Sequence, residues 1–319
     1  MKRRNLSGYS LGLCTVVAMF SGCGGSEPPI GAPGAQSLMV ANHARRDRSW
    51  MLPEAKSKNL LYVSTYDDNE VYVFSYPKGA PMGTLSGFTH VGGLCTDTAG
   101  NIWIGDYDKV LEYAHGGTQP IATLDNPMPS SLIGSCSVDP MTGNLAISNT
   151  PFGSDYGNVG VYKQAKGSPT YRQIDQPQQC SYDESRNLYC DTYALESSGF
   201  GLYKLPAGKT RFVKVNLNAS ILVPGGVQWD GQNLAVGDAK QNVVLRFRMR
   251  GRRGGYVGSM HLEGADWVNE FSIAKSRIAG ANQVSKSVMI WPYPQGGKPT
   301  TKLHHIHAIG VTVSLALPH

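Results

Sequence analysis

Short apolar runs that end in a turn recur along the chain at a nearly constant spacing. A second run, in which apolar and polar residues alternate, follows each of them, as in LLYVSTYDDNEVYVF (Leu60–Phe74) and NLAVGDAKQNVVLRF (Asn233–Phe247). Alternation with a period of two predicts β-strands, and the Gly, Asn and Asp residues between the runs predict tight turns. Because no long stretch has the 3.6-residue period of a helix, the pattern predicts an all-β protein.

The first run occurs six times and defines a repeat of 41 to 46 residues. The copies begin at Leu61, Ile102, Leu145, Leu188, Leu234 and Ile278. Each repeat also contains a landmark near its end: GGLCTD at Gly92, GSCSVD at Gly134, QCSYD at Gln179, GGVQWD at Gly225, EFSIAK at Glu270 and GVTVSL at Gly310. A period in the forties with several short strands per unit is typical of the blades of a β-propeller.

The two ends of the chain are out of phase with the repeat. The first repeat starts at its second strand, and the chain ends with the landmark strand of a further unit, IGVTVSLAL (Ile309–Leu317). Pairing the last strand with the first repeat would remove an exposed sheet edge, whereas an open β-sandwich does not explain the offset. The prediction is an all-β, six-bladed β-propeller over residues 60–319, closed by pairing the C-terminal inner strand with the first repeat.

One repeat, VPGGVQWDGQNLAVGDAKQNVVLRF (Val223–Phe247), resembles an NHL-type propeller repeat, and the resemblance covers about residue 60 to the C-terminus. It implies that segments such as GGVQWD form the innermost strand of each blade. The stretches SWMLPEAK, EYAHGG and PGGVQWDG also resemble a set of uncharacterised bacterial lipoprotein propellers. That likeness brings no known activity.

Two groups of propeller enzymes resemble the chain more distantly. Gluconolactonase-like propellers hold a divalent cation on the axis, in part through Asn-bearing turns before inner strands. The matching turns, from THVGG to HAIGV, do not supply that Asn, so this site is not carried over. Virginiamycin-lyase-like propellers need a His and an acid near the axis, which makes His90, Glu270 and His307 the candidate catalytic residues of an enzyme alternative.

The N-terminus has the pattern of an export signal. Lys2, Arg3 and Arg4 precede a ten-residue apolar core (Leu11–Phe20), which is too short to span a bilayer, so residues 1–22 are interpreted as a signal peptide. FSGC, ending at Cys23, resembles a bacterial lipobox and implies that Cys23 is lipidated. The alternative is an ordinary signal peptide with an incidental Cys. Residues 23–59 are interpreted as the lipidated Cys and a flexible tether, since Gly, Pro, Ala and Ser dominate their first half.

These features predict a protein of the bacterial cell envelope. Gly24 after the cysteine favours the outer membrane, on its periplasmic or surface side; in a host with one membrane we expect the extracellular face of the plasma membrane. Without the three basic residues of the signal peptide, the chain has 26 basic and 23 acidic residues, a net charge of +3. This charge is too small to indicate a nucleic-acid partner, and we expect a monomer.

Four cysteines lie in the repeats: Cys95, Cys136, Cys180 and Cys190. Export would permit disulfides, and Cys180 and Cys190 flank the turn SYDESRNLY. A five-residue turn would place them directly opposite each other, whereas a four-residue turn would place them on opposite faces. Buried free thiols remain an alternative, because three of the four occupy positions held by apolar residues in other repeats.

Two polar patterns have both a structural and a functional interpretation. In KLHHIH, His305 and His307 would share one face of a strand and could bind Zn or Cu with a third ligand, although an exposed strand is the preferred interpretation. Asp or Asn residues recur at the end of the first run, at Asp106, Asn149, Asp191, Asp238 and Asn282. We interpret them as turn-forming residues, because Asx side chains bond their own backbone.

The loops before the inner strands and after the first run of each repeat are rich in aromatic residues and carboxylates. The candidate ligand-binding residues there are Tyr66, Tyr107, Tyr156, Tyr193 and Trp267, which come from five repeats. Such a mixture suits stacking on, and hydrogen bonding to, a glycan, a peptide or a protein. The sequence therefore predicts a membrane-anchored binding or scaffold module without a cofactor. The alternative is a lactonase-, lyase- or hydrolase-like enzyme with an axial site and a divalent metal.

Overall fold

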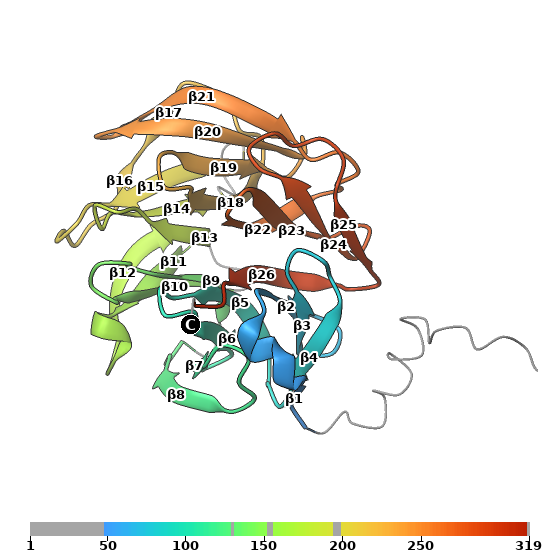
Figure 1. Ribbon diagram of the computed structural model, residues 1–319. Helices are drawn as coiled ribbons and strands as arrows, with labels where there is room; N and C mark the ends of the chain where they lie inside the picture. The colour runs from blue at the N-terminus through green and yellow to red at the C-terminus, as the bar shows by residue number, and fades with distance from the viewer. Residues whose placement is uncertain (1–47, 129–130, 152–155, 194–198, 318–319) are drawn as a thin grey trace, which may run out of the picture. The chain divides into compact units, whose positions relative to one another are not determined.

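Six β-sheets, one for each predicted repeat, are arranged as the blades of a propeller (Figure 1). The computed structural model describes residues 48–128, 131–151, 156–193 and 199–317. Within these ranges the helical elements are two short 3-10 turns, η2 (Pro53–Ser57) and η3 (Lys163–Ala165). None of the described helices is long and apolar enough to cross a membrane.

The blades are numbered in chain order. Blade 1 contains β1 (Trp50–Met51), β2 (Leu60–Thr65), β3 (Val71–Ser75), β4 (Pro81–Leu85) and, from the other end of the chain, β26 (Ala308–Ser314). Blade 2 contains β5 (Val91–Thr96), β6 (Ile102–Asp106), β7 (Lys109–Tyr113) and β8 (Pro120–Asp125). Blade 3 contains β9 (Ser131–Val138), β10 (Leu145–Pro151), β11 (Tyr156–Tyr162) and β12 (Thr170–Asp175).

The second half of the chain forms three further blades. Blade 4 contains β13 (Pro177–Tyr182), β14 (Leu188–Thr192), β15 (Gly201–Leu205) and β16 (Val213–Lys214). Blade 5 contains β17 (Asn216–Leu217), β18 (Pro224–Trp229), β19 (Leu234–Asp238), β20 (Val243–Arg250) and β21 (Arg253–His261). Blade 6 contains β22 (Val268–Ala274), β23 (Arg277–Asn282), β24 (Ser287–Pro292) and β25 (Thr301–His304).

The C-terminal strand closes the ring. β26 pairs with β2 in antiparallel register, with Leu61 opposite Val313 and Val63 opposite Val311. The innermost strands β5, β9, β13, β18, β22 and β26 follow one another around the axis, and β26 contacts both β22 and β5. We call these six strands the inner ring. The predicted six-bladed propeller and its closure by the last strand are confirmed.

Blade 1 begins earlier than Leu60, where the sequence analysis placed its start. Trp50 and Met51 form β1, which pairs with Thr84 and Gly83 of β4 as an outer strand. The turn η2 then brings Ala55, which is fully buried, against the core. Two residues are too few to show a strand period, so the sequence pattern did not reveal this strand.

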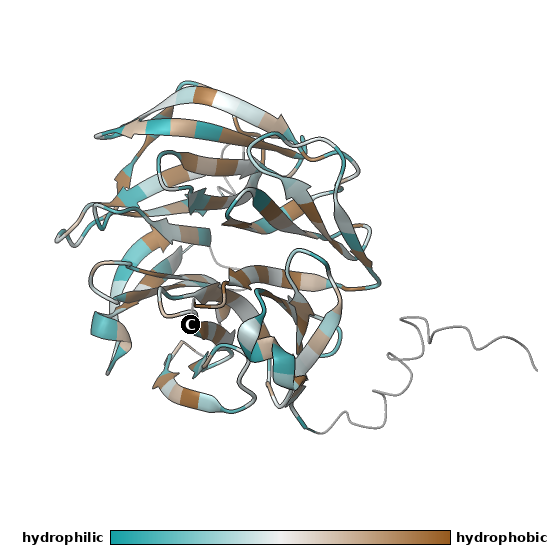
Figure 2. Cartoon of the chain, viewed as in Figure 1, coloured by the Kyte–Doolittle hydropathy of each residue, from teal (hydrophilic) through white to brown (hydrophobic). Residues whose placement is uncertain are grey.

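Hydrophobic side chains on both faces of the sheets are buried between neighbouring blades. Between blades 6 and 1, for example, Val63 and Val311 pack with Ala281 and Ile290. Figure 2 accordingly shows hydrophobic segments along the strands and hydrophilic ones in many of the loops. Because a blade is covered on both faces, a strand such as β2 is buried at every position rather than at alternate ones.

Side chains at one position of the repeat link each inner strand to the next. Four of these links are hydrogen bonds that a backbone N–H donates to the preceding blade: Tyr182 to Ser137 Oγ (3.0 Å), Trp229 to Ser181 Oγ (3.0 Å), Ile273 to Gln228 Oε1 (2.5 Å) and Val313 to Ser272 Oγ (3.2 Å). The fifth joins the hydroxyls of Thr312 and Thr96, 3.0 Å apart, and the sixth is a disulfide between Cys95 and Cys136. We call these six links the ring bonds.

The four cysteines of the repeats form two disulfides. Cys180 and Cys190 lie opposite each other on β13 and β14, the register that the five-residue turn would produce, and they are bonded. The Cys95–Cys136 bond joins blades 2 and 3 and was missed by the sequence analysis, which considered only pairing across a turn. The alternative of buried free thiols, which concerned Cys136, Cys180 and Cys190, is therefore wrong.

The two disulfides should differ in their contribution to stability. Replacing Cys95 and Cys136 by Ala removes a cross-link of sequence separation 41, whereas replacing Cys180 and Cys190 by Ala removes one of separation 10. In the chain-entropy model the longer loop contributes about 1 kcal/mol more to the free energy of unfolding. Urea unfolding of both double variants measures the difference. An equal or smaller loss for the Cys95–Cys136 pair would contradict the expectation.

Candidate functional site

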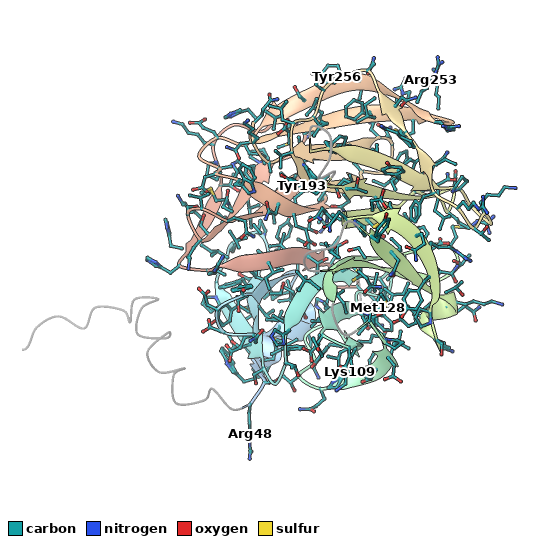
Figure 3. All side chains as sticks on the ribbon, turned by 180° about the vertical axis from the view of Figure 1, so that it is seen from behind. Arg48, Lys109, Met128, Tyr193, Arg253 and Tyr256 are labelled. Atoms are coloured by element: carbon teal, nitrogen blue, oxygen red, sulfur yellow. A yellow bond between two sulfur atoms is a disulfide. The ribbon has the colours of Figure 1, made fainter. Side chains whose placement is uncertain are left out.

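Five aromatic side chains are exposed on the loops that lead into the inner strands or join the second and third strands of the blades. These loops form one face of the propeller, which we call the loop face. Its aromatic residues are between 39% and 77% exposed and are the five that the sequence analysis named: Tyr66, Tyr107, Tyr156, Tyr193 and Trp267. Figure 3, seen from behind, shows Tyr193 in the middle part of the molecule. Three stretches, residues 129–130, 152–155 and 194–198, lie outside the described residues.

Three of these tyrosines occupy equivalent positions in their blades. The backbone N–H of each donates to a carbonyl of the loop that leads into the inner strand: Tyr66 to His307 (2.9 Å), Tyr107 to His90 (3.1 Å) and Tyr193 to Gln176 (3.1 Å). The rings of Tyr66 and His307 lie 5.4 Å apart, and those of Tyr107 and His90 lie 5.6 Å apart. The backbone of these positions is thus tied to the fold while the rings face solvent.

Trp267 is held in an unusual backbone conformation. Its φ of 65° lies in the left-handed region that side-chain-bearing residues rarely adopt. Its N–H donates to Asn242 Oδ1 (2.9 Å), and its carbonyl accepts the N–H of Gln283 (3.2 Å). The surrounding structure therefore maintains a backbone conformation that keeps the indole partly exposed.

A charged cluster lies beside Tyr66. Asp67 accepts a hydrogen bond from the ring of His307 (Nδ1 to Oδ1, 3.0 Å), and it forms an ion pair with Lys286 (Nζ to Oδ2, 3.3 Å). The hydrogen bond from His307, helped by Lys286, holds the pKa of the Asp67 carboxyl below its usual value. This cluster joins loops of blades 1 and 6. It places a negatively charged and a positively charged side chain, Asp67 and Lys286, near the ring of Tyr66 on the loop face.

The structure does not assemble the histidine sites considered from the sequence. His90 and His307 pair with loop tyrosines, whereas Glu270 is buried in β22, and no contact among the described residues joins the three. β25 ends at His304, and His305 has a φ of 60°, so the strand geometry expected for His305 and His307 is absent. The described residues contain no group of three His, Cys, Asp or Glu side chains that could hold a metal ion.

Most of the recurring Asp and Asn residues hold the loops in place. Asp106 accepts hydrogen bonds from the N–H groups of Thr89 and His90 (2.7 and 2.8 Å) in the loop that precedes β5. Asp238 accepts one from Leu222 (2.8 Å) before β18. Asn282 and Asn149 are also engaged through their side chains. These contacts agree with the structural role that the sequence analysis assigned.

Asp191 does not belong to this set. It occupies the preceding position of the repeat, where the other blades have Ser64, Gly105, Ser148, Gly237 and Ala281. Its carboxylate is fully buried and accepts hydrogen bonds from the N–H groups of Gln179 (2.8 Å) and Gly226 (2.9 Å), which joins blade 4 to blade 5. The interpretation of Asp191 as a turn former is therefore wrong. In the sequence, only its offset by one position from the other Asp and Asn residues indicated that Asp191 differs from them.

Glu270 and Gln179 are also exceptions to the repeat. At their shared position the other inner strands have Gly93, Ser135, Gly226 and Gly310. A Cβ atom on Gly310 would lie 2.8 Å from Glu270 Oε2, and one on Gly226 would overlap Gln179 Oε1. The two glycines thus leave room for the two longer side chains. Gln179 Nε2 donates to the Phe271 carbonyl (3.0 Å), whereas its Oε1 has no partner.

Burial dominates the ionisation of the two acids. It raises the pKa of Asp191 to about 7, against the opposing effect of the hydrogen bonds from Gln179 and Gly226. It raises the pKa of Glu270 well above its usual value, and the neighbouring Asp191 adds to this shift. A buried carboxylate is costly to ionise unless a positive charge balances it. We call Asp191, Glu270 and Gln179 the axial set.

A central cavity of about 840 Å³ opens on the opposite side from the loop face. It is lined by the inner ring, with Gln179 among the lining residues, and its mouth lies at the turns after the inner strands, near Glu184, Lys275 and Leu317. Asp191 and Glu270 are not among its lining residues. The cavity results from the assembly of six strands, so no single motif could reveal it.

The comparisons with known proteins support the fold alone. A chain of the nidogen/laminin complex is similar to this one with a TM-score of 0.63 and 14% identity, covering 82% of this chain and 99% of that chain. A protein of unknown function from Bacteroides caccae has a TM-score of 0.61 and 11% identity, covering 81% and 99%. A functionally unknown protein from Desulfotomaculum acetoxidans DSM 771 has a TM-score of 0.54 and 12% identity, covering 85% and 89%. No protein-family model and no curated protein sequence matches the chain.

Gly226 should be intolerant of substitution because of the axial set. Gly226→Ala introduces a Cβ that overlaps Gln179 Oε1, at a φ of 97°. Gly231→Ala is a matched control, since Gly231 has a φ of 95° and nothing within 4 Å of its added Cβ. We expect the free energy of unfolding to fall by about 1–3 kcal/mol more for Gly226→Ala than for the control. Equal losses in chemical denaturation would show that the contact with Gln179 is unimportant.

Proposed function

We propose that this protein is an exported, lipid-anchored propeller that binds a glycan, peptide or protein ligand through its loop face. The observation that carries the proposal is the set of five exposed aromatic residues on this one face, contributed by five different blades. Aromatic side chains lose little conformational entropy when they bind, and they stack on sugar rings and apolar side chains. A ligand that contacted several of them would span the face rather than a single blade.

The fixed backbone of the loop face supports binding. Trp267 and Tyr107 keep left-handed backbone conformations, with φ of 65° and 53°, through hydrogen bonds to neighbouring loops. A surface that is ordered before it binds loses less entropy on association. The Asp67 cluster adds hydrogen-bonding groups beside Tyr66. A similar chain occurs in the nidogen/laminin complex, so the fold is compatible with a protein partner.

Export and lipidation rest on the N-terminal sequence, where residues 1–47, including Cys23, lie outside the described residues. The basic head, the short apolar core and the lipobox-like FSGC support an anchored lipoprotein, which fits the resemblance to bacterial lipoprotein propellers. The two disulfides also support this location, because disulfides persist in oxidising compartments.

The enzyme alternative has one specific observation in its favour, the buried acids Asp191 and Glu270 near the axis. Active sites often contain such perturbed groups. However, neither acid lines the central cavity, so a substrate in that cavity would not reach them directly. Metal-dependent turnover of a lactone or ester that a single change at His90, His307 or Glu270 abolishes would favour the enzyme over the binding module.

The ligand-binding prediction concerns the aromatic residues. In Trp267→Ala combined with Tyr107→Ala, a glycan or peptide ligand identified by array screening should bind at least about tenfold more weakly, a loss of roughly 1.4 kcal/mol or more. Tyr256→Ala is the matched control, because Tyr256 is 45% exposed but lies on β21, one of the two outer strands of blade 5. Single changes at His90, His307 or Glu270 should alter the affinity less than tenfold. Unchanged affinity in the double variant, measured by calorimetry, would remove the loop face as the binding surface.

The anchoring prediction concerns Cys23. Cys23→Ser removes the acceptor of the lipid, so the protein should move from the membrane fraction to the soluble fraction when cells are fractionated. Cys14→Ser, which changes the other cysteine of the N-terminal segment, should leave the protein in the membrane fraction. Equal membrane retention of both variants would contradict lipidation at Cys23.

A further inference from the structure

A second pocket, of about 310 Å³, lies between blades 3 and 4 on the side opposite the loop face. It is formed by the turns that follow the inner strands and the turns that precede the outer strands of these two blades. The central cavity opens on the same side, and Tyr182 lies between the two spaces because it lines both. The pocket is therefore separate from the loop face and its aromatic residues.

Four basic side chains from four separate segments line this pocket. Lys163 follows β11 and Arg172 lies on β12, both in blade 3. Arg186 lies in the turn after β13 and Lys209 in the turn after β15, both in blade 4. None of the four side chains forms an ion pair or a hydrogen bond with another described residue. We call Lys163, Arg172, Arg186 and Lys209 the basic set.

The acidic residue among the described pocket residues does not balance the basic set. Asp139 is 2% exposed, and its carboxylate accepts hydrogen bonds from the N–H of Met141 (2.9 Å) and the hydroxyl of Thr142 (2.5 Å). Its oxygens are thus engaged within their own turn. Arg172 is only partly exposed, so its guanidinium loses part of its hydration without gaining a protein anion. The pocket has the charge and the donors for an anionic ligand.

The charge of the chain would draw anions toward this part of the molecule. Residues 201–261, which form most of blades 4 and 5, contain ten basic and two acidic residues. The rest of the chain from Cys23 onward contains 16 basic and 21 acidic residues. A region of one predominant sign raises the local concentration of ligands of the opposite sign. Lys209 belongs to this basic region and lines the pocket.

We propose that the basic set binds a phosphomonoester about the size of a monosaccharide phosphate. Guanidinium groups form paired hydrogen bonds with phosphate oxygens, and lysine adds a compact positive charge. A phosphomonoester carries roughly 1.5 to 2 negative charges at pH 7, so four cations suit it better than a carboxylate or a phosphodiester with a single charge. A volume of about 310 Å³ is at the lower end of the range for small-molecule sites.

The uncharged residues of the pocket suit the organic part of such a ligand. Asn144 Oδ1 accepts the N–H of Gln164 (2.9 Å), which leaves the amide group of Asn144 as a donor, and Thr170 adds a hydroxyl. Val161 and Leu205 provide apolar surface. This combination can bind a sugar ring through its hydroxyls and its apolar face. The site lies away from the loop face, so it does not depend on the ligand proposed there.

The test is a calorimetric titration of the purified full-length protein with glucose 6-phosphate, in non-ionic detergent and a phosphate-free buffer of low ionic strength. The Kd should be about 1 mM or lower, and the phosphodiester glycerophosphoglycerol should bind at least about tenfold more weakly. Arg172→Gln should weaken the binding of glucose 6-phosphate at least about tenfold. Arg248→Gln is the matched control, because it removes one positive charge from an exposed arginine outside the pocket, and it should bind as the wild type does.

Each outcome decides the proposal. Equal losses in Arg172→Gln and Arg248→Gln would show a general effect of net charge and overturn it, as would a failure of glucose 6-phosphate to bind the wild type at about 10 mM. Equal affinity for the diester would assign the pocket to a phosphodiester, such as a lipid headgroup, and would also overturn the proposal. If Arg172→Gln does not fold, Lys209→Gln in the turn after β15 decides: weaker binding supports the site, and unchanged binding rejects it.

Discussion

The ring bonds are the interactions on which the rest of the structure depends. Each inner strand is the edge of its own sheet, so one side of its backbone has no neighbouring strand to bond. In four blades a side chain of the preceding blade accepts the N–H group that would otherwise be unpaired, as Ser272 does for Val313. An unmet buried N–H group costs about 1–3 kcal/mol. The ring bonds therefore satisfy the edges of the sheets and hold the blades in order at the same time.

The residues at the ring-bond position are similar in all six blades, whereas the residues two positions earlier in the inner strands differ between blades. The ring-bond position carries a polar side chain or a cysteine in every blade, and its role is structural throughout. Two positions earlier in the strand, most blades have Gly or Ser, but Gln179 and Glu270 break the pattern. The residues that hold the blades together recur in every repeat. A residue near the axis that departs from the repeat is therefore not needed to hold the blades together. This contrast separates the axial set from the Asx residues that hold the loops.

The sequence predicted the fold well because each blade repeats the same strand and turn chemistry. Six copies of one pattern gave the number of blades, and the phase offset at Ile309–Leu317 gave the closure by β26. The five exposed aromatics of the loop face were also found, since loops before inner strands follow from the repeat. What was missed depends on contacts between repeats: the Cys95–Cys136 bond, and the meeting of Asp191 with Gln179 and Glu270. Cys136 is 41 residues from Cys95 and Glu270 is 79 residues from Asp191, and no local pattern reports such separations. Asp191 and Gln179 are only 12 residues apart, but the repeat offers no equivalent of their contact in the other blades.

The five-stranded blade 1 has a mechanical consequence. The described chain enters this sheet at its outer edge, through β1, and leaves it at its inner edge, through β26. Tension on the N-terminus would first peel away β1, which is held to β4 by only two residue pairs, Trp50 with Thr84 and Met51 with Gly83. Three strands, β4, β3 and β2, separate this pairing from the one between β2 and β26, which has six residue pairs. A force applied from the N-terminal side would thus detach β1 before it acted on the β2–β26 pairing that closes the ring.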